Sequence, residues 1–482
     1  MQTGEGFRIE RRAFLQAVAI LLGLMLAAGL LTKLAPAGAF DRVIKDGRET
    51  VIPGSYHEIA RPHYPAWRWL TAPVEVLWGS DAAMVITIII FLTMIGGAFA
   101  VLQRGGILQS VVAGIVKRFG GRKYALLLAV SFFFMAAGAL FGIFEEVVPL
   151  APIMVALSWS LGWDSLVGLG MSVMAVNLGF SAAITNPFTI GVAQRIAGLP
   201  LFSGSLFRIP VFLTVYATFA VFLVRYAKRI EKAPEQSPVF NEDKGARERF
   251  SPETDESVGE RPGFRAAVAW FCGAVGLTLL MLAMTPFIPA LADVAFPLVG
   301  LLFVIGGAGA GRLSGMPWRG VWRAFGGGAK DVAPAILLIL MAASVKHIVS
   351  TGGIMDTLLF KASGLLTDAG PFGAAVFVYA AALAMEFFIS SGSAKAFLVI
   401  PVLMPLAELL GVTRQVTVQA YCFGDGFANL IYPTSPTLLI CLGLTVVSYP
   451  KWLRWSLKFW LYLIPVTLAL LAVGVAVRLG PF

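Results

Sequence analysis

Hydrophobic residues in this chain form long segments that are separated by short polar tracts rich in Lys and Arg. A helix needs about 20 apolar residues to cross a bilayer, and several segments reach that length. We expect unbroken spans at residues 13–34, 82–102, 207–224, 266–284, 291–309, 332–349 and 457–477. The pattern predicts an all-α polytopic membrane protein.

Two further apolar segments, residues 166–196 and 416–446, are broken by Pro and polar residues. The breaks read Thr185-Asn186-Pro187-Phe188-Thr189 and Pro433-Thr434-Ser435-Pro436-Thr437. Lipid offers no hydrogen bonds, so an interrupted helix at mid-depth must line protein or a watery cavity. The alternative is that the Pro residues only kink packed helices.

Each broken segment follows a long apolar stretch, at residues 125–163 and 372–410. Such a stretch could make two full crossings or a re-entrant hairpin with its tip inside the membrane. We favour the hairpin, because it places Glu145 and Glu146 inside the membrane, where they could serve a function. Two crossings would leave them in an external turn.

The two regions match over about 120 residues, a length typical of the internal repeats of secondary transporters. Basic tracts mark cytoplasmic loops, and with that rule the first unit enters the membrane from outside and the second from the cytoplasm. The sequence therefore predicts two inverted repeats, each with a re-entrant helical hairpin and a discontinuous transmembrane helix. The expected divisions are a first helix with an external segment (1–80), repeat 1 (81–200), connecting helices with a flexible cytoplasmic linker at about 227–263 (201–330), repeat 2 (331–450) and a terminal helix (451–482).

Composition supports a membrane protein, since 58% of the 482 residues are hydrophobic, 13% are charged and the mean hydropathy is +0.82. The net charge of +10 could suggest nucleic acid, but the basic residues lie in short tracts between apolar spans, so we expect no nucleic-acid binding. We expect the cytoplasmic (inner) membrane, with the amino terminus in the cytoplasm and the carboxyl terminus outside.

Charged residues inside apolar segments are the strongest candidates for function, because each costs about 2.5 kcal/mol or more at the bilayer centre. Glu145 and Glu146 lie at the expected tip of the first hairpin, and Lys395 lies at the matching place in the second. An ion pair between Glu146 and Lys395 across the two tips is one hypothesis. Asp425 and Asn429 lie one helical turn apart, and Asn177 is their approximate counterpart in repeat 1. Simple interhelical hydrogen bonding is the alternative role for these three polar residues.

Carbonyl and hydroxyl oxygens at the breaks would suit sodium, and half-helix amino ends would suit a carboxylate. The carboxylates outnumber Lys395, which favours a cationic or zwitterionic solute or coupling cations. The candidate substrate or ion-binding residues are Glu145, Glu146, Asn177, Thr185, Asn186, Pro187, Thr189, Ser391, Gly392, Ser393, Lys395, Asp425, Asn429, Thr434, Ser435 and Thr437.

Other classes of function fit the sequence less well. No group of His, Cys and carboxylates has metal-site spacing, so we expect no metal beyond a transported sodium ion and no cofactor. No nucleophile stands beside a base, so we do not expect an enzyme. A passive channel would need like polar residues along one continuous pore, whereas here they converge at mid-depth.

Segments from both halves of the chain resemble the YfcC family, within the anaerobic C4-dicarboxylate carrier and arginine/ornithine antiporter-like group of the ion transporter superfamily. The matching segments are PGSYHEIA, FEEVVPLAP, GWDSLVGLG, NPFTIGVAQRIAGLP, SSGSAKAFLVIPVLMPLAELLGVTRQ and FGDGFANLIYPTSPTLL. The resemblance implies a homodimeric secondary carrier that moves a transport domain against a scaffold. It also implies that the substrate is a small organic solute, with basic amino acids slightly favoured over dicarboxylates. Sodium, protons or exchange would drive the transport.

Overall fold

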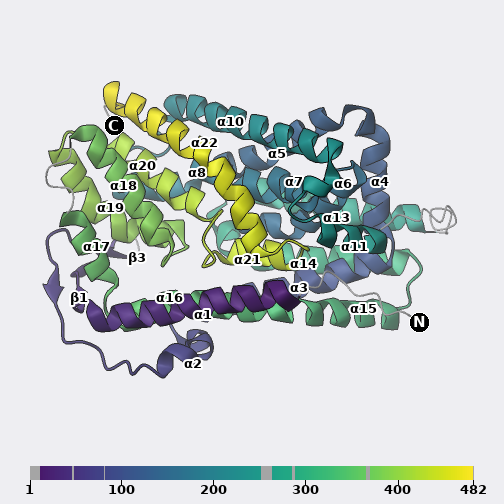
Figure 1. Ribbon diagram of the computed structural model, residues 1–482, viewed down its shortest axis with the longest axis horizontal. Coiled ribbons are helices and arrows are strands. Elements are labelled where there is room, and N and C mark those ends of the chain that lie inside the picture. The colour runs from purple at the N-terminus through teal and green to yellow at the C-terminus, as the bar shows by residue number, and fades with distance from the viewer. Residues whose placement is uncertain are drawn as a thin grey trace.

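The computed structural model describes residues 11–45, 48–80, 82–250, 263–284, 288–364 and 370–480, and most of them are helical (Figure 1). This confirms the predicted all-α membrane class. Within the described residues, eight helices are long and apolar enough to cross a membrane: Phe14–Leu34, Ala82–Arg104, Lys123–Phe141, Ser205–Lys232, Phe264–Met281, Trp318–Thr351, Gly392–Leu409 and Tyr449–Ala476.

The first helix, α1 (Arg11–Leu34), packs along α16 (Ala333–Thr351) at one side of the molecule (Figure 1). The segment after α1 is anchored on repeat 2: Phe40 N–H and the Arg42 guanidinium both bind the Asp356 carboxylate, at 2.9 and 2.7 Å. Its regular elements are β1 (Gly38–Ala39) paired with β4 (His57–Glu58), β2 (Arg42–Lys45) paired with β3 (Arg48–Val51), α2 (Arg68–Glu75) and η1 (Val76–Trp78).

Four helices form a tight bundle in which backbones approach closely. Gly96 and Gly328 face each other so closely that a Cβ on Gly328 would lie 2.2 Å from the Gly96 carbonyl oxygen. Such small-residue contacts let membrane helices pack without a hydrophobic driving force between them. The four helices are α3 (Ala82–Arg104), α13 (Phe264–Met284), α14 (Pro289–Leu313) and α15 (Trp318–Asp331).

Repeat 1 contains the predicted hairpin and broken helix. The hairpin limbs are joined through residues 142–144, and the broken helix is interrupted at residues 182–186. Its elements are α4 (Ile107–Phe119), η2 (Gly120–Arg122), α5 (Lys123–Phe141), η3 (Glu145–Leu150), α6 (Ala151–Ser160), α7 (Ser165–Leu169), η4 (Gly170–Met174), α8 (Ala175–Ser181), η5 (Pro187–Gly191) and α9 (Val192–Ile196).

Repeat 2 has the same order of elements. Its hairpin turns at residues 387–391, and its broken helix is interrupted at residues 429–435. The elements are α17 (Met355–Ser363), α18 (Pro371–Glu386), α19 (Gly392–Leu409), α20 (Arg414–Ala428) and α21 (Pro436–Gly443).

The equivalent short helices α4 and α17 lie at opposite ends of the long axis (Figure 1). This placement agrees with an inverted relation of the two repeats. The hairpin limbs α5 and α19 are each long enough to cross a membrane, so length does not separate a hairpin from two crossings. The enclosure of the first tip favours the hairpin, since the Phe144 side chain is only 5% exposed.

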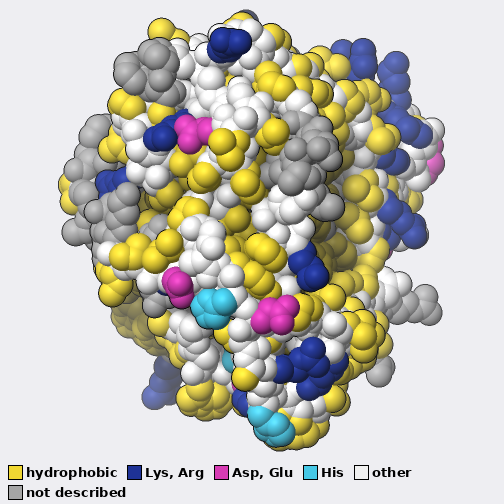
Figure 2. Space-filling view, turned by 90° about the vertical axis from the view of Figure 1, so that its left-hand side faces the viewer, with side chains coloured by type: hydrophobic (Ala, Val, Ile, Leu, Met, Phe, Trp, Pro, Cys, Tyr) yellow, Lys and Arg dark blue, Asp and Glu magenta, His cyan; other side chains and the backbone are white. Residues whose placement is uncertain are grey.

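Helices α10 (Ser205–Lys232) and α22 (Tyr449–Ala476) run side by side, and the chain after α10 folds back as η6 (Pro234–Gln236) and α11 (Phe240–Phe250). The prediction of a flexible linker over 227–263 is therefore wrong for residues 227–250; residues 251–262 lie outside the described residues. On the end that carries α17, charged side chains of both signs are interspersed with apolar ones (Figure 2).

Candidate functional site

The first hairpin tip presents two carboxylates from a turn that glycine makes possible. Helix α5 ends where Gly142 adopts a left-handed conformation with φ of 71°. Glu145 and Glu146 begin η3, and the Phe144 N–H donates a hydrogen bond of 3.0 Å to Glu146 Oε2. This tip therefore carries its own anionic cap.

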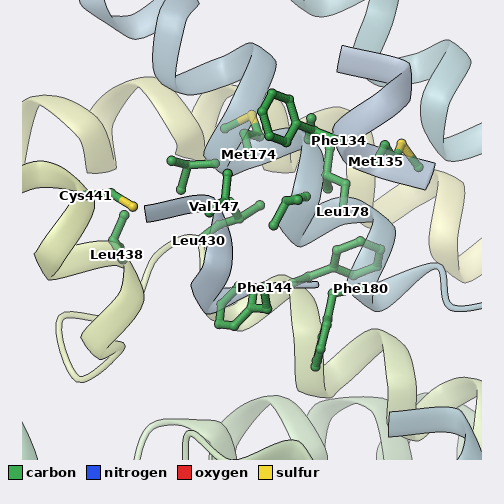
Figure 3. Close-up of a cluster of buried hydrophobic side chains, with 14 of the residues drawn as sticks. Phe134, Met135, Phe144, Val147, Met174, Leu178, Phe180, Leu430, Leu438 and Cys441 are labelled. Carbon is green, nitrogen blue, oxygen red and sulfur yellow. The ribbon is translucent and has the colours of Figure 1, made fainter. Parts of the chain in front are cut away.

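An apolar cluster beneath this tip holds it in place (Figure 3). The Phe144 and Phe180 rings lie 5.1 Å apart, and Val147 and Leu430 join the same buried cluster. Because Leu430 belongs to the second break, the cluster links the first tip to both broken helices.

The second tip has the opposite polarity. Ser391 caps α19, since its Oγ accepts a hydrogen bond of 3.4 Å from the Ala394 N–H. Gly392 lies directly against the Asp425 carboxylate, where a Cβ would be 2.7 Å from Oδ2. The amino end of an 18-residue helix carries a partial positive charge and free amides, so this tip suits an anionic group.

The two tips enclose a pocket of about 400 Å³. Its remaining wall comes from the first turns of α3, from aromatic rings and from the second broken helix. The lining residues are Ala83, Met84, Thr87, Ile88, Gly142, Phe144, Glu145, Glu146, Phe180, Phe188, Ser390, Ser391, Gly392, Ser393 and Asn429. Among the described residues, two carboxyl groups and no Lys or Arg line the pocket.

Lys395 lies beside the pocket, where other carboxylates compensate its charge, and it does not pair with Glu146. Its Nζ forms ion pairs with Glu386 and with Asp425 Oδ1, the latter at 2.7 Å, and the three side chains are at most 1% exposed. The hypothesis of a Glu146 to Lys395 ion pair is therefore wrong. The reason is geometric: Glu386 ends α18 and Asp425 lies on the adjacent α20, so both reach Lys395 from within repeat 2.

The first break is tied to the first hairpin. Both Ile184 N–H and Thr185 N–H donate to the Ala139 carbonyl, at 2.9 and 3.1 Å. Thr185 Oγ1 donates to the Leu140 carbonyl at 3.0 Å. Asn186 caps the half-helix beyond, since its Oδ1 accepts from Phe188 N–H at 2.8 Å.

Free carbonyl oxygens were expected at the breaks, and the structure corrects part of this prediction. In the second break, the Leu430 and Ile431 carbonyls accept from Trp452 Nε1 at 2.7 Å and Tyr449 Oη at 2.6 Å. Side-chain oxygens remain instead: within the described residues, Asn177 Oδ1, Thr434 Oγ1 and Ser435 Oγ are buried without a hydrogen-bond partner.

The predicted site residues thus fall into two groups. Glu145, Glu146, Ser391, Gly392, Ser393 and Asn429 line the pocket. The others lie behind it, in the wall or at the breaks: Asn177, Thr185, Asn186, Pro187, Thr189, Lys395, Asp425, Thr434, Ser435 and Thr437.

The sequence analysis missed Glu386 and Arg208. Both are charged residues inside apolar segments, at 1% and 0% exposure, so the same insertion cost that singled out Glu145 could have found them. Arg208 Nε donates to the Ile184 carbonyl of the first break at 3.3 Å. The aromatic wall of Phe144, Phe180 and Phe188 carries no sequence signal beyond hydrophobicity.

A polytopic helical protein with interrupted helices around a partly open pocket that two carboxyl groups line has the architecture of a membrane transporter. The chain belongs to the C4-dicarboxylate anaerobic carrier family, whose model matches residues 14–477.

Known proteins give more detail. The chain is 31% identical to the "Putative basic amino acid antiporter YfcC" of Escherichia coli (strain K12), over 92% of this chain and 93% of that one. It is 25% identical to an uncharacterized protein of Haemophilus influenzae, over 86% and 79% of the two chains. Two solved structures are also similar: the YdaH transporter of Alcanivorax borkumensis (TM-score 0.44, 20% identity, 97% of this chain and 100% of that one) and the Neisseria gonorrhoeae efflux pump MtrF (TM-score 0.40, 16% identity, 95% and 94%).

Proposed function

We propose that this protein is a secondary active transporter of small organic cations and zwitterions, basic amino acids first, in the cytoplasmic membrane. The observation that carries the proposal is the charge of the pocket, which Glu145 and Glu146 line without any Lys or Arg. A guanidinium or ammonium group would replace its hydration by charge-assisted hydrogen bonds to these carboxylates.

The second tip would bind the other end of the same solute. The capped amino end of α19 at Ser391 and Gly392 offers amides and a partial positive charge to an α-carboxylate. A basic amino acid has both groups, with a chain of carbon atoms between them that suits the apolar wall of Phe144 and Phe188. The name of the Escherichia coli relative supports the same substrate class.

Coupling to sodium or protons, or exchange of one solute for another, would drive transport. The unpartnered oxygens of Asn177, Thr434 and Ser435 are hard ligands of the kind that sodium prefers. We further propose a homodimer with a cytoplasmic amino terminus and an external carboxyl terminus.

The family description favours a second candidate, a C4-dicarboxylate carrier. A dicarboxylate needs two cationic or amide-rich anchors, and the pocket has one, at α19. The two glutamates at the other tip would repel it, so we rank this candidate second.

Uptake into proteoliposomes tests the proposal. Under an imposed sodium or proton gradient, or with a basic amino acid trapped inside, labelled arginine, lysine or ornithine should accumulate above its external concentration, whereas succinate should not. Accumulation also excludes a passive channel, which can only equilibrate its solute. Concentrative uptake of succinate alone would favour the second candidate instead.

Glu146→Gln should lower the initial rate of this uptake roughly tenfold or more, because one charge-assisted contact to the cation is lost. The amide oxygen can still accept from the Phe144 N–H, so the tip should keep its fold. Glu58→Gln, on the exposed strand β4, is the matched control and should transport normally. Unchanged uptake by correctly inserted Glu146→Gln protein would contradict the role of the pocket glutamates.

A further inference from the structure

A second cavity lies on the side of the molecule, far in sequence from either hairpin. It is a groove of about 670 Å³ between α10 and α22, near the basic ends of both helices. Gln236 and Pro238, which follow α10, close it at one end. Neither the pocket at the tips nor the breaks contribute a residue to it.

The groove is positively charged. Arg225, Arg229 and Lys458 line it, and no Asp or Glu of the described residues does. Arg229 donates through Nε to the neutral Gln236 Oε1 at 2.7 Å, and within the described part of the chain it forms no ion pair. Within the described residues, the exposed side chains of Arg225 and Lys458 form no ion pair, in contrast to Lys451 on the same helix, which pairs with Glu242.

The rest of the groove is apolar and faces outward. Phe222 packs on Trp455 with ring centroids 5.4 Å apart, and these rings form the floor. Leu461 and Tyr462 stand at the rim with 75% and 56% of their surface exposed. Such residues on the side of a membrane helix face acyl chains, and Trp and Tyr favour the headgroup level.

We propose that this groove binds an anionic phospholipid of the leaflet that contacts the basic ends of α10 and α22. The lipid phosphate would lie among Arg225, Arg229 and Lys458, and an acyl chain would follow the aromatic floor between the helices. Basic pockets between membrane helices bind anionic headgroups in this way. The leaflet is the cytoplasmic one if the proposed orientation holds; the site itself depends on neither that orientation nor the substrate.

Lipid retention tests the site directly. The full-length protein, purified in detergent, is incubated with phosphatidylglycerol or phosphatidylcholine, and bound lipid is counted by native mass spectrometry. We expect phosphatidylglycerol to be retained and phosphatidylcholine to be lost. The Arg225→Gln and Lys458→Gln double variant should bind phosphatidylglycerol roughly thirtyfold more weakly, because two of the three cations are removed.

A matched control separates this site from general attraction of anionic lipid. Arg319→Gln with Arg323→Gln removes two exposed cations from α15, which contributes no residue to the groove, and should leave retention unchanged. Equal loss in the control, or equal retention of both lipids, would overturn the proposal.

Two further experiments distinguish the lipid from two other possible occupants of the groove, a free anion and a second copy of the chain. If inorganic phosphate alone displaces the lipid, and raises the unfolding temperature as much as phosphatidylglycerol does, the groove is a site for a free anion. If a Leu461→Cys variant in a Cys272→Ser background forms a disulfide-linked dimer in vesicles in high yield, a second copy of the chain covers the groove. Either result would replace the lipid assignment, whereas bound lipid with a monomeric Leu461→Cys protein would support it.

Discussion

At the scale of single residues, the arrangement of Lys395 shows how a membrane interior tolerates charge. The side chain is fully buried, yet it contacts two carboxylates, those of Glu386 and Asp425. Removing one member of a buried ion pair costs more than the pair itself contributes, because the remaining charge has no solvent. The position of Lys395 as a functional candidate could be predicted from sequence, but its partners could not, because they depend on which helices pack beside α19.

This triad predicts an asymmetric response to mutation. Lys395→Met leaves two carboxylates facing each other without a cation and should destabilise the protein by about 3–5 kcal/mol. Glu386→Gln leaves a one-to-one pair of Lys395 with Asp425 and should cost clearly less. The measurement is the thermal unfolding midpoint of the purified variants by intrinsic tryptophan fluorescence. A greater loss in Glu386→Gln than in Lys395→Met would contradict this account.

At the scale of elements, apolar runs and Pro residues predicted most spans and both breaks within a few residues, because these features are local. Helices α10 and α22 extend further than predicted, to Lys232 and back to Tyr449. Helices α11 and α15 were missed, and α11 shows one reason. The segment of α11, residues 240–250, mixes both charge signs and lacks an apolar face, so nothing local predicts its order. Its partners come from repeat 1: Asp243 accepts from Ser165 N–H at 2.8 Å, and Arg247 donates to the Trp163 carbonyl.

The docking of α11 should depend on pH. Burial, reinforced by the nearby Asp164 carboxylate, raises the pKa of Asp243 to about 7, while its hydrogen bonds with Ser165 and the charge of Arg247 oppose the rise. The pKa of Asp243 in the docked helix lies above the ordinary value near 3.8. The stabilisation of docking by protonated Asp243 is therefore complete below a pH near 3.8 and is lost as the pH rises through 7. Trypsin cleavage after Lys244 should therefore be slower at pH 6 than at pH 8.

Variants of the same helix isolate Asp243 as the cause. Asp243→Asn can keep both contacts to Ser165 without a charge, so its cleavage should be slow at both pH values once the pH dependence of trypsin itself is subtracted. Glu248→Gln, exposed on the same helix, should behave as wild type. A pH profile that persists in Asp243→Asn would assign the effect to another group.

At the scale of the whole molecule, the two repeats place their equivalent short helices at opposite ends (Figure 1). Residues of both hairpin tips line one pocket. The repeat could be recognised from sequence because a long apolar stretch followed by an apolar segment broken by Pro occurs in both halves of the chain. The contents of the pocket could be predicted only in part. Glu145 and Asn429 were found because polar groups are rare in apolar segments, whereas Met84 and Thr87 of α3 enter from outside both tips and carry no such signal.

The predicted inverted arrangement leads to a testable expectation about the two ends of the chain. Helix α1 begins towards the end of the molecule that carries α4 and α15, and α22 finishes at the end that carries α17 (Figure 1). If basic tracts face the cytoplasm, a fluorescent protein fused after Phe482 should be dark, because it is exported unfolded, and alkaline phosphatase fused there should be active. The same reporters fused after Lys232, at the basic end of α10, should give the reverse result. A bright carboxyl-terminal fusion would contradict the proposed orientation of the carboxyl terminus and, with it, the predicted inverted topology.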